Sequence, residues 1–577
     1  MRRLRRFQAV FALCLLAFPL AAERVVVSVL ATTDLHGNIY PIDYFRDQPA
    51  ARGLARISTL VRAARAENPN ALLIDCGDTI QGTPLEYVYQ QYVRTGKLPL
   101  SLPMPDEPLR ADPMMLAMNH LRYDALVLGN HDFNYGLRSL DRARADARFP
   151  WLSANTAVEP GSGRRPFAPY LLKTVAGVRV AVIGVTTPAI PNWEKPENYR
   201  GYRFEPAVEA VERTLAQLRS ERPDLVVVAA HAGRGPDPGG GAEAARGAPG
   251  ENMALDIATR VEGVDAVVYG HSHLELAGEK IGNVLLVQPR NWGMSLARLD
   301  FTLERSPDGR FAVVEKTSRL IPVRANTEAD PELIRIARPY HEAAERYLNT
   351  VVAEAAEPLD GAAGRVEDTP LVDAIQAVQL AFTGADVSFT AMFNPRLRVA
   401  KGPVTVRQIA ALYVYDNELY ALEGDGKMVK DALENSARYF VSCRDEACTR
   451  PPLTNPRVAG YNYDMAEGVE YEIDLTQPEG NRIRNLRWKG RPLSPGQKLR
   501  IAVNNYRAGG SGGYGMFRSA PVVWQSGEDI RQLIIDYYSR KRQLPVKADG
   551  NWRIVPAAAR ETLLRQAQAE ARQAAAR

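Results

Sequence analysis

Most of the few histidines in this chain follow short apolar runs. Five of the seven come shortly after such a run, most of them beside Asp, Asn or Gly. In an α/β sheet, ligands gather at the carboxyl ends of the strands. If the runs are strands, the side chains that follow them converge on one cavity, and this pattern is the strongest constraint on the fold. Five polar segments follow apolar runs in this way. Four of them hold the five histidines, and the fifth, residues 75–78, holds two aspartates. The segments are residues 33–37, 75–78, 129–132, 231–233 and 270–273.

The apolar runs lie in the first half of the chain and alternate with helical or loop stretches. They are rich in Val, Ile and Leu, as buried strands are. Residues 54–66 carry basic residues spaced among apolar ones, which predicts a helix. The alternation indicates an α/β layer architecture. The runs cover residues 25–30, 71–74, 125–128, 178–183, 225–230, 266–269 and 284–287.

The length of 577 residues exceeds what one hydrophobic core organises, so we expect two domains. Hydrophobic residues make up 46% and charged residues 24%, which excludes a disordered or fibrous chain. Residues 235–250 are rich in Gly, Pro and Ala and predict a mobile loop. The predicted segments are a signal peptide at 1–22, a catalytic domain at 23–325, a connector at 326–352, a second α+β domain at 353–556 and a tail at 557–577.

The connector is predicted to be a helix over residues 327–352. Asp330 is suited to cap it, and Pro331 suits the first helical position. Pro339 lies inside the segment and is expected to kink the helix. The tail is rich in Ala, Arg and Gln and predicts a helix or a frayed end.

The first 22 residues predict a secretory signal peptide. Four arginines precede an apolar run over residues 7–20, and Ala21 and Ala22 supply small residues for cleavage. The alternative is an uncleaved membrane anchor, for which the run is short. No other stretch is long enough to cross a membrane. We therefore expect a periplasmic or secreted protein.

Charge gives no sign of binding to a nucleic-acid polymer. The chain has 72 basic and 67 acidic residues, and the predicted signal removes four of the basic ones, which leaves 68 against 67. Without a basic run, no polymeric nucleic acid is expected as a partner.

Three cysteines lie outside the signal segment. Cys443 and Cys448 bracket a short polar stretch, so we expect them to close a small disulfide loop in an oxidising compartment; the alternative is two unlinked thiols. Cys76 follows an apolar run and is expected to be a buried thiol.

The polar residues after the runs suit a metal centre. Imidazole nitrogen and carboxylate oxygen suit Zn, Mn or Fe. A single motif of this kind is weak, because a lone histidine after a strand is more often structural, but five in this order are hard to assign to chance. His120 and His341 fall in helical stretches and are interpreted as structural. Seven ligands are too many for one tetrahedral ion and suit two ions that share a bridging carboxylate: Asp34, His36, Asp78, Asn130, His231, His271 and His273.

In their order, the motifs D-x-H, G-D, G-N-H-[DE], H and G-H-x-H resemble the calcineurin-like metallophosphoesterase superfamily. Residues 32–36 and 129–131 also resemble its 5′-nucleotidase branch, and the second domain resembles that branch's nucleotide-binding domain. The resemblance implies a four-layer β-sandwich with flanking helices, a connecting helix and a C-terminal α+β domain. It also implies two divalent ions, Zn, Mn, Fe or Co.

The resemblance assigns roles by position. Asp78 would bridge the two ions. His131 would lie over the phosphate, where it would stabilise the charge of the transition state or protonate the leaving oxygen. The ligands of the first ion would be Asp34, His36 and His273, and those of the second Asn130, His231 and His271.

One position departs from the 5′-nucleotidases. They place an Asp four residues after the Asn ligand, in support of the catalytic His, where this chain has Asn134. An Asn cannot stabilise an imidazolium by its charge. The form GNHDFNYG, with Asp132 after His131, instead resembles the 2′,3′-cyclic-nucleotide 2′-phosphodiesterase/3′-nucleotidase group. Trp193, residues 251–254 and the GHSH pair share that resemblance, so we group His131, Asp132 and Asn134 as catalytic.

The second domain is expected to hold the base between aromatic rings. Stacking is worth about 1–3 kcal/mol per base. Tyr415 and Tyr514 lie where the resembling family has aromatic residues, and Tyr413 is a close rival of Tyr415. Tyr514 follows a glycine-rich loop that could close over a ligand. Further candidates for contacts to ribose or phosphate are Asn394, Arg396, Arg398, Asn504 and Asn505.

These features predict an exported, monomeric hydrolase of nucleotide phosphoesters. We expect a 2′,3′-cyclic-nucleotide 2′-phosphodiesterase with 3′-nucleotidase activity. The alternatives are a 5′-nucleotidase or nucleotide-sugar hydrolase, a related enzyme acting on a non-nucleotide ester, and an inactive nucleotide-binding protein. The resemblance also suggests that the two domains rotate about the connector during turnover.

Overall fold

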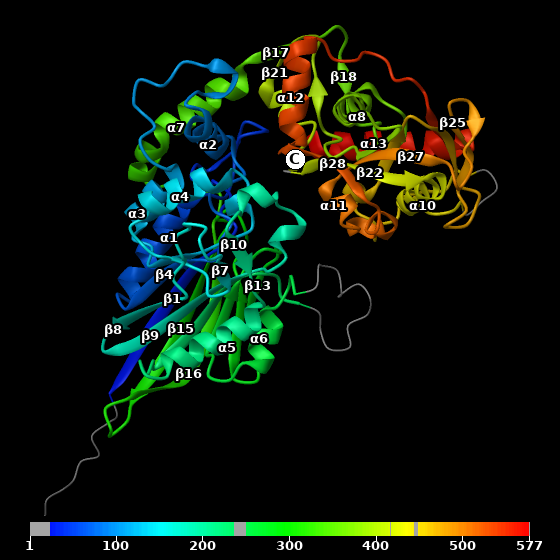
Figure 1. Ribbon diagram of the computed structural model, residues 1–577. Helices are drawn as coiled ribbons and strands as arrows, with labels where there is room; N and C mark the ends of the chain where they lie inside the picture. Colours follow the sequence, from blue (N-terminus) through cyan, green and yellow to red (C-terminus); the bar gives the residue numbers. More distant parts are fainter. Residues whose placement is uncertain (1–22, 236–249, 416, 444–447, 576–577) are drawn as a thin grey trace, which may run out of the picture.

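The structure is a computed structural model that describes residues 23–235, 250–415, 417–443 and 448–575. The predicted signal peptide and nearly all of the predicted mobile loop lie outside these ranges. Figure 1 shows two domains, one built on large sheets and one smaller, joined at the top of the view. Among the described residues, no helix combines the length and the apolar character that a membrane crossing requires.

The first domain contains two six-stranded sheets. All seven apolar runs form strands in them, as predicted. Strands β1, β4, β5 and β6 pair in parallel in one sheet, and β14, β12, β11 and β9 do so in the other. One sheet has the order β16 (Phe311–Pro322), β15 (Ser295–Arg305), β1 (Arg24–Thr32), β4 (Ala71–Asp75), β5 (Ala125–Val127) and β6 (Trp151–Leu152). The other has the order β13 (Leu276–Ile281), β14 (Val284–Gln288), β12 (Ala266–Tyr269), β11 (Leu225–His231), β9 (Val178–Thr186) and β8 (Tyr170–Val175).

The two sheets pack face to face. Alternate side chains of each strand point to opposite faces of its sheet, so one set lies between the sheets and the other set faces the helices. Val27 and Val29 of β1 pack against the second sheet, whereas Leu30 faces helices α1 (Leu54–Glu67) and α3 (Pro113–Leu121). On the second sheet, residues such as Ile183 face helices α5 (Ala207–Leu218) and α6 (Ala254–Arg260). The predicted four-layer sandwich is therefore confirmed.

Helix α7 (Pro331–Asn349) joins the two domains. The backbone N–H of Glu332 donates to Asp330 Oδ1 at 2.9 Å, so the predicted cap is present. The helix runs through Pro339 without ending. Its apolar face packs on α2 (Pro84–Thr95) and α3, and Tyr340 donates to the Ala111 carbonyl at 2.6 Å. The connector is thus packed against the first domain.

The second domain has a five-stranded and a four-stranded sheet. The first has the order β23 (Asp464–Glu467), β19 (Val387–Ala391), β27 (Lys498–Asn504), β22 (Glu418–Asp425) and β28 (Val522–Asp529). The second has the order β26 (Arg491–Pro492), β25 (Ile483–Trp488), β24 (Glu470–Asp474) and β29 (Trp552–Val555). Its longer helices are α8 (Pro370–Thr383), α10 (Gly426–Ala437), α12 (Ile530–Lys541) and α13 (Ala557–Ala575).

The remaining elements are short, apart from α4. In the first domain they are β2 (Ile42–Asp43), β3 (Gln48–Pro49), α4 (Gly136–Asp146), β7 (Thr156–Val158) and β10 (Tyr202–Phe204). In the second domain they are β17 (Val351–Ala355), β18 (Leu359–Asp360), β20 (Arg398–Val399), β21 (Gly402–Thr405), α9 (Val406–Ala410) and α11 (Asn505–Ala508).

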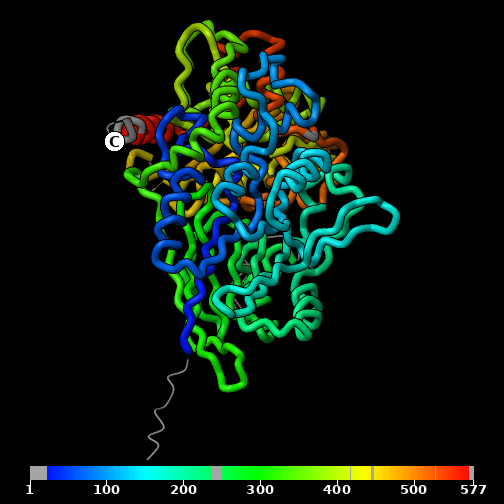
Figure 2. Tube along the Cα trace, turned by 90° about the vertical axis from the view of Figure 1, so that its left-hand side faces the viewer, coloured from blue at the N-terminus to red at the C-terminus, as the bar shows by residue number. Residues whose placement is uncertain are grey.

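The tail and the cysteines follow the predictions. Residues 557–575 form helix α13, with Leu563 buried against the second domain, and Figure 2 shows this helix in red at the upper left. Cys443 and Cys448 are joined in a disulfide, which confirms the predicted loop. Cys76 is a buried free thiol.

Polar contacts join the second domain to the first. Arg407 of α9 donates to the Tyr44 carbonyl and pairs with Glu345 of α7 at 2.6 Å. Arg94 of α2 pairs with Glu528 of β28 at 3.3 Å. These contacts hold the second domain against α2, α7 and the segment after β2 of the first domain.

Candidate active site

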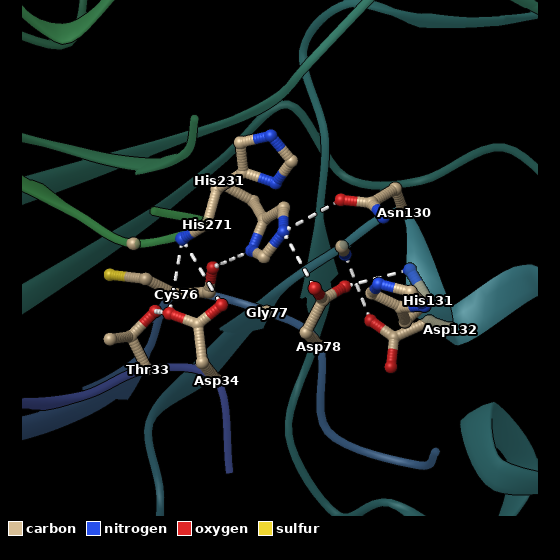
Figure 3. A network of polar contacts seen from close by, with 12 residues as sticks. Thr33, Asp34, Cys76, Gly77, Asp78, Asn130, His131, Asp132, His231 and His271 are labelled. Atoms are coloured by element: carbon tan, nitrogen blue, oxygen red, sulfur yellow. Dashed lines mark hydrogen bonds and ion pairs between the residues drawn. The ribbon is translucent and has the colours of Figure 1, made fainter. Parts of the chain in front are cut away.

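The predicted ligands meet where strands of both sheets end. β1, β4 and β5 of one sheet and β11 and β12 of the other deliver them, and Figure 3 shows Asp34, Asp78, Asn130, His231 and His271 around one space. Both packed sheets of the predicted sandwich therefore contribute to the site. Their aligned carboxyl ends allow residues some 240 positions apart to touch.

One group of ligand atoms comes from Asp34, His36 and His273. The His36 Nε2 and His273 Nε2 atoms lie 3.1 Å apart, and His273 Nε2 lies 3.4 Å from Asp34 Oδ1. These atoms lie within 4.8 Å of one another. The three residues are those predicted for the first ion, and their role as ligands stays a prediction.

A second group comes from Asp78, His231 and His271. His231 Nε2 lies 3.0 Å from both Asp78 Oδ2 and Asn130 Oδ1. Asp78 Oδ2 also lies 3.9 Å from His36 Nε2 in the first group. Asp78 therefore stands between the two groups, where a bridging carboxylate would have to be.

Hydrogen bonds to backbone carbonyls orient His231 and His36. His231 Nδ1 lies 2.7 Å from the Cys76 carbonyl, and His36 Nδ1 lies 3.0 Å from the Gln81 carbonyl. A carbonyl only accepts, so each Nδ1 carries a proton, and Nε2 is the atom that could bind a metal ion after losing any proton of its own. This is the tautomer that a metal ligand needs. The donor set therefore fits divalent metal ions.

The backbone is strained at five of the seven predicted ligands. Asp34, His36, Asp78, His271 and His273 have φ between 46° and 70°. Non-glycine residues in this left-handed region cost of order 1–3 kcal/mol each and cluster at functional sites. The turns also require close approach: a Cβ at Gly270 would lie 1.9 Å from Thr33 Oγ1. The fold thus uses strain to aim these side chains at one space.

The charges of the site are buried. Burial tends to raise the pKa of Asp34, but the hydrogen bond from His273 and its charge lower it to about 2. Burial tends to lower the pKa of His231, but the charge of Asp78 and its hydrogen bond raise it to about 10. The carboxylates therefore need neighbouring cations, and divalent ions meet the same need.

Asp132 does not have the predicted catalytic role. Its side chain is fully buried and accepts hydrogen bonds from the backbone N–H groups of Gly129 at 2.8 Å, Thr79 at 2.9 Å and Ile80 at 3.2 Å. It ties the loop after β4 to the loop after β5. The correction follows from these bonds, because a carboxylate so enclosed cannot touch a substrate.

His131 stands at the edge of the ligand groups. Its backbone N–H donates to Asp78 Oδ1 at 2.7 Å, and its ring lies 5.4 Å from that of His36. Its Nδ1 atom lies 2.7 Å from Asn134 Oδ1, so the two residues form the predicted pair. The cleft that His131 lines is also lined by Glu418 and Asn505 of the second domain. The two domains therefore meet beside this histidine.

Tyr514 lies elsewhere than predicted. Its ring is fully buried and stacks on Phe517, and its hydroxyl contacts Ser436 Oγ at 2.7 Å and the Asp464 N–H at 3.2 Å. No face of this ring is open to a base, so the prediction of a clamp at Tyr514 is corrected. The glycines before it form a packed turn.

Other tyrosines are exposed. Tyr415 is 41% exposed, whereas its rival Tyr413 is buried. Tyr461 and Tyr506 are each 44% exposed, and the Tyr415 and Tyr461 rings lie 6.2 Å apart. We call Tyr415, Tyr461 and Tyr506 the tyrosine platform. Tyr461 carries no signal in the sequence, whereas Tyr506 follows the candidate pair Asn504 and Asn505, and that position could have identified it.

Four of the five remaining candidates do not line the cleft beside His131. Asn394 donates to the Ala411 carbonyl at 3.1 Å, and Arg398 pairs with Asp360 at 2.8 Å. Arg396 is exposed and lines a separate cavity beside α13. Asn504 caps α11 by accepting from the Arg507 N–H at 2.8 Å. Asn505 alone of this set lines the cleft lined by His131.

The sequence matches two known families. Residues 27–275 match the calcineurin-like phosphoesterases, and residues 351–519 match the 5′-nucleotidase C-terminal domain. The trifunctional nucleotide phosphoesterase protein YfkN of Bacillus subtilis is 30% identical over 93% of this chain, which spans only 39% of that protein's length. The 2′,3′-cyclic-nucleotide 2′-phosphodiesterase/3′-nucleotidase of Salmonella typhimurium is 28% identical over 96% of this chain and 92% of its own.

A solved structure shares the fold of both domains. A Staphylococcus aureus protein provisionally named a 5′-nucleotidase superposes with a TM-score of 0.73 at 26% identity, over 92% of this chain and all of that one. The fold, the paired ligand groups and the two family matches agree. This chain therefore belongs to the calcineurin-like phosphoesterases that carry a 5′-nucleotidase C-terminal domain, and it is a metal-dependent phosphoester hydrolase.

Proposed function

We propose that this protein hydrolyses 2′,3′-cyclic nucleotides to 3′-nucleotides and then releases nucleoside and phosphate. The observation that carries the proposal is the convergence of seven metal-type side chains on a space beside His131, at a cleft shared with the second domain. The choice of substrate rests on Asn134 within GNHDFNYG and on relatives named for this activity, which this chain covers over 88–92% of their length.

The residues divide the chemistry. Two divalent ions, held by the two ligand groups with Asp78 between them, would clamp the phosphoryl group and activate water as a nucleophile. His131 Nε2 would hydrogen-bond the ester oxygen that leaves and give it a proton. The tyrosine platform would stack the base. The cleft would hold the ribose between these two contacts.

A 5′-nucleotidase is the second candidate, because the Staphylococcus aureus structure superposes over its whole length. A phosphate-release panel decides between them. Our proposal predicts product from 2′,3′-cyclic AMP and 3′-AMP, and much less from 5′-AMP. Cleavage of 5′-AMP alone would show that our interpretation of Asn134 is wrong.

We also propose that the protein is exported and acts as a monomer. The support for export is the pattern of residues 1–22 and the disulfide between Cys443 and Cys448, since disulfides persist in oxidising compartments. Sequencing of the mature amino terminus from cell fractions tests export. Light scattering tests the monomer.

Removing divalent ions with a chelator is expected to abolish phosphate release and to lower the thermal midpoint of the first domain. Ligands that bind only the folded state stabilise it, by about 2.7 kcal/mol at a hundred times Kd. Elemental analysis, activity after adding back Mn, Zn or Co, and thermal unfolding measure the effects. Full activity in protein that contains no transition metal would contradict the metal centre and our choice of ligands.

Replacing Tyr415 or Tyr506 with Ala is expected to raise KM for nucleotides about tenfold, since stacking is worth about 1–3 kcal/mol per base. KM for p-nitrophenyl phosphate should stay unchanged, because it has no base. Tyr537→Ala on helix α12 is a control for the loss of a tyrosine outside the platform. Equal effects on both substrates would exclude the platform as the base site.

A further inference from the structure

Asn134 stands between His131 and a buried carboxylate. His131 Nδ1 and Asn134 Oδ1 lie 2.7 Å apart, and Asn134 Nδ2 donates to Glu194 Oε2 at 2.7 Å. Glu194 is only 6% exposed. Its position follows Trp193, in a segment after β9 that supplies none of the predicted metal ligands. The three side chains form an unbroken relay from the catalytic histidine into the interior.

The chemistry of the three groups sets the direction of both hydrogen bonds. An ionised carboxylate only accepts, so the NH2 group of Asn134 must face Glu194. The amide oxygen of Asn134 then faces the imidazole, and this oxygen also only accepts. His131 Nδ1 must therefore carry a proton. That leaves His131 Nε2 as the atom that can exchange a proton at the cleft.

Glu194 is itself held in place. Its Oε1 atom accepts from the Lys195 N–H at 2.7 Å and from Asn198 Nδ2 at 2.8 Å. Asn198 Nδ2 also contacts the Asn134 carbonyl at 3.3 Å. Burial raises the pKa of Glu194, but the hydrogen bonds donated by Asn198, the Lys195 N–H and Asn134 oppose this effect. All the hydrogen-bond partners found for Glu194 are donors, and this geometry suits the ionised form. A buried group with these contacts can fix the orientation of its neighbour.

We propose that Glu194 is a positioning residue for the hydrolysis, which locks the amide of Asn134 and through it the tautomer and orientation of His131. Glu194 supplies, one side chain further back, the negative charge that an aspartate at position 134 would place directly on the ring. The inference rests on the proposed function, in which His131 gives a proton to the leaving oxygen. Asn134 is then a functional part of the relay.

The proposal predicts an effect that depends on the leaving group. General acid catalysis matters for an alcohol such as the ribose hydroxyl and little for p-nitrophenol, which leaves as a stable anion. Glu194→Gln is expected to lower kcat for 3′-AMP by about 10- to 100-fold, because a glutamine can present either its oxygen or its NH2 group to Asn134. It should lower kcat for p-nitrophenyl phosphate by less than about threefold.

A rescue separates this role from packing. In the protein as it stands, Asn134→Asp places two carboxylates in contact and should lower kcat for 3′-AMP as far as Glu194→Gln does. Combined with Glu194→Gln, Asn134→Asp should restore most of the activity, because the new glutamine can donate to the new carboxylate. A purely structural role for Glu194 predicts no rescue.

The controls use the same chemical change. Glu434→Gln alters another buried glutamate that accepts two backbone N–H groups, those of Arg482 and Ile483, and it should leave both substrates unaffected. Thermal midpoints exclude general unfolding. In a His131→Ala background, Glu194→Gln should have no further effect on 3′-AMP, because the relay then has no histidine to orient.

Three outcomes would overturn the proposal: an equal loss on both substrates, a full additional loss in the His131→Ala background, or no rescue by Asn134→Asp. Glycerol phosphate serves as a second ester with an alcohol leaving group. If wild-type protein cleaves glycerol phosphate but no nucleotide, the proposed substrate class fails while the test of Glu194 can still be completed. The two failures are thus distinguishable.

Discussion

Replacing Asp78 with Asn is expected to lower kcat on every phosphoester by about 10³-fold or more. Asp78 Oδ2 lies 3.0 Å from His231 Nε2 in one ligand group and 3.9 Å from His36 Nε2 in the other. Metal ions contribute several kcal/mol to such reactions, and about 4 kcal/mol corresponds to about 10³ in rate. Loss of the shared carboxylate weakens both groups, so metal content should fall as well.

Asp112→Asn is the matched control for this change. Asp112 is as buried as Asp78 but caps helix α3 by accepting from the Met115 N–H at 3.0 Å, and asparagine caps helices equally well. Activity and metal content should stay near those of the wild type. Elemental analysis and phosphate release measure both variants. Undiminished turnover in Asp78→Asn would remove the basis for the assigned metal centre.

The first domain was predictable because its signals are local. Each of the seven predicted strands is visible in the sequence as an apolar run. Each predicted ligand lies at a strand end or within a few residues of one, as Asp34 follows β1 and His231 ends β11. Strand ends converge in any layered fold, so the grouping required no knowledge of register. The use of two facing sheets was not visible in the runs themselves and came only with the resemblance.

The errors arose where distant residues decide the environment. Tyr514 follows four glycines within residues 509–513, which suggested an open loop, yet residues 50 and 78 positions away hold its hydroxyl. Asp132 is adjacent to His131, but backbone groups of the loop after β4 enclose it. Glu194 was missed for the same reason, because it reaches Asn134 across 60 residues.

The second domain contains a charge pair that links its stability to the tyrosine platform. Arg507 donates through Nε to Asp464 Oδ2 at 2.7 Å and through Nη2 to Asp464 Oδ1 at 2.9 Å. The two side chains are 2% and 1% exposed. The guanidinium stacks on Tyr514 at 4.4 Å and contacts Tyr506 of the platform at 5.4 Å. It also donates to the Tyr461 carbonyl at 2.6 Å.

Replacing Asp464 with Ala is therefore expected to destabilise the second domain by about 3–5 kcal/mol, because it leaves a buried guanidinium without its carboxylate. Calorimetry that resolves the unfolding of the two domains measures the loss, since one transition cannot describe a two-domain chain. KM for nucleotides should rise with it, because Arg507 holds both Tyr461 and Tyr506. Metal content should not change, since the ligand groups belong to the first domain.

The double variant Asp464→Leu with Arg507→Met distinguishes charge from packing. It removes both charges and keeps apolar volume, and replacing a whole buried ion pair in this way is often nearly neutral for stability. We therefore expect it to be more stable than Asp464→Ala, while KM stays high because the platform has lost its support. A surface ion pair contributes less than about 1 kcal/mol to stability. If Asp464→Ala lowers the free energy of unfolding by no more than that, the guanidinium has found water or another acceptor. Arg507 then does not anchor the platform through its pair with Asp464.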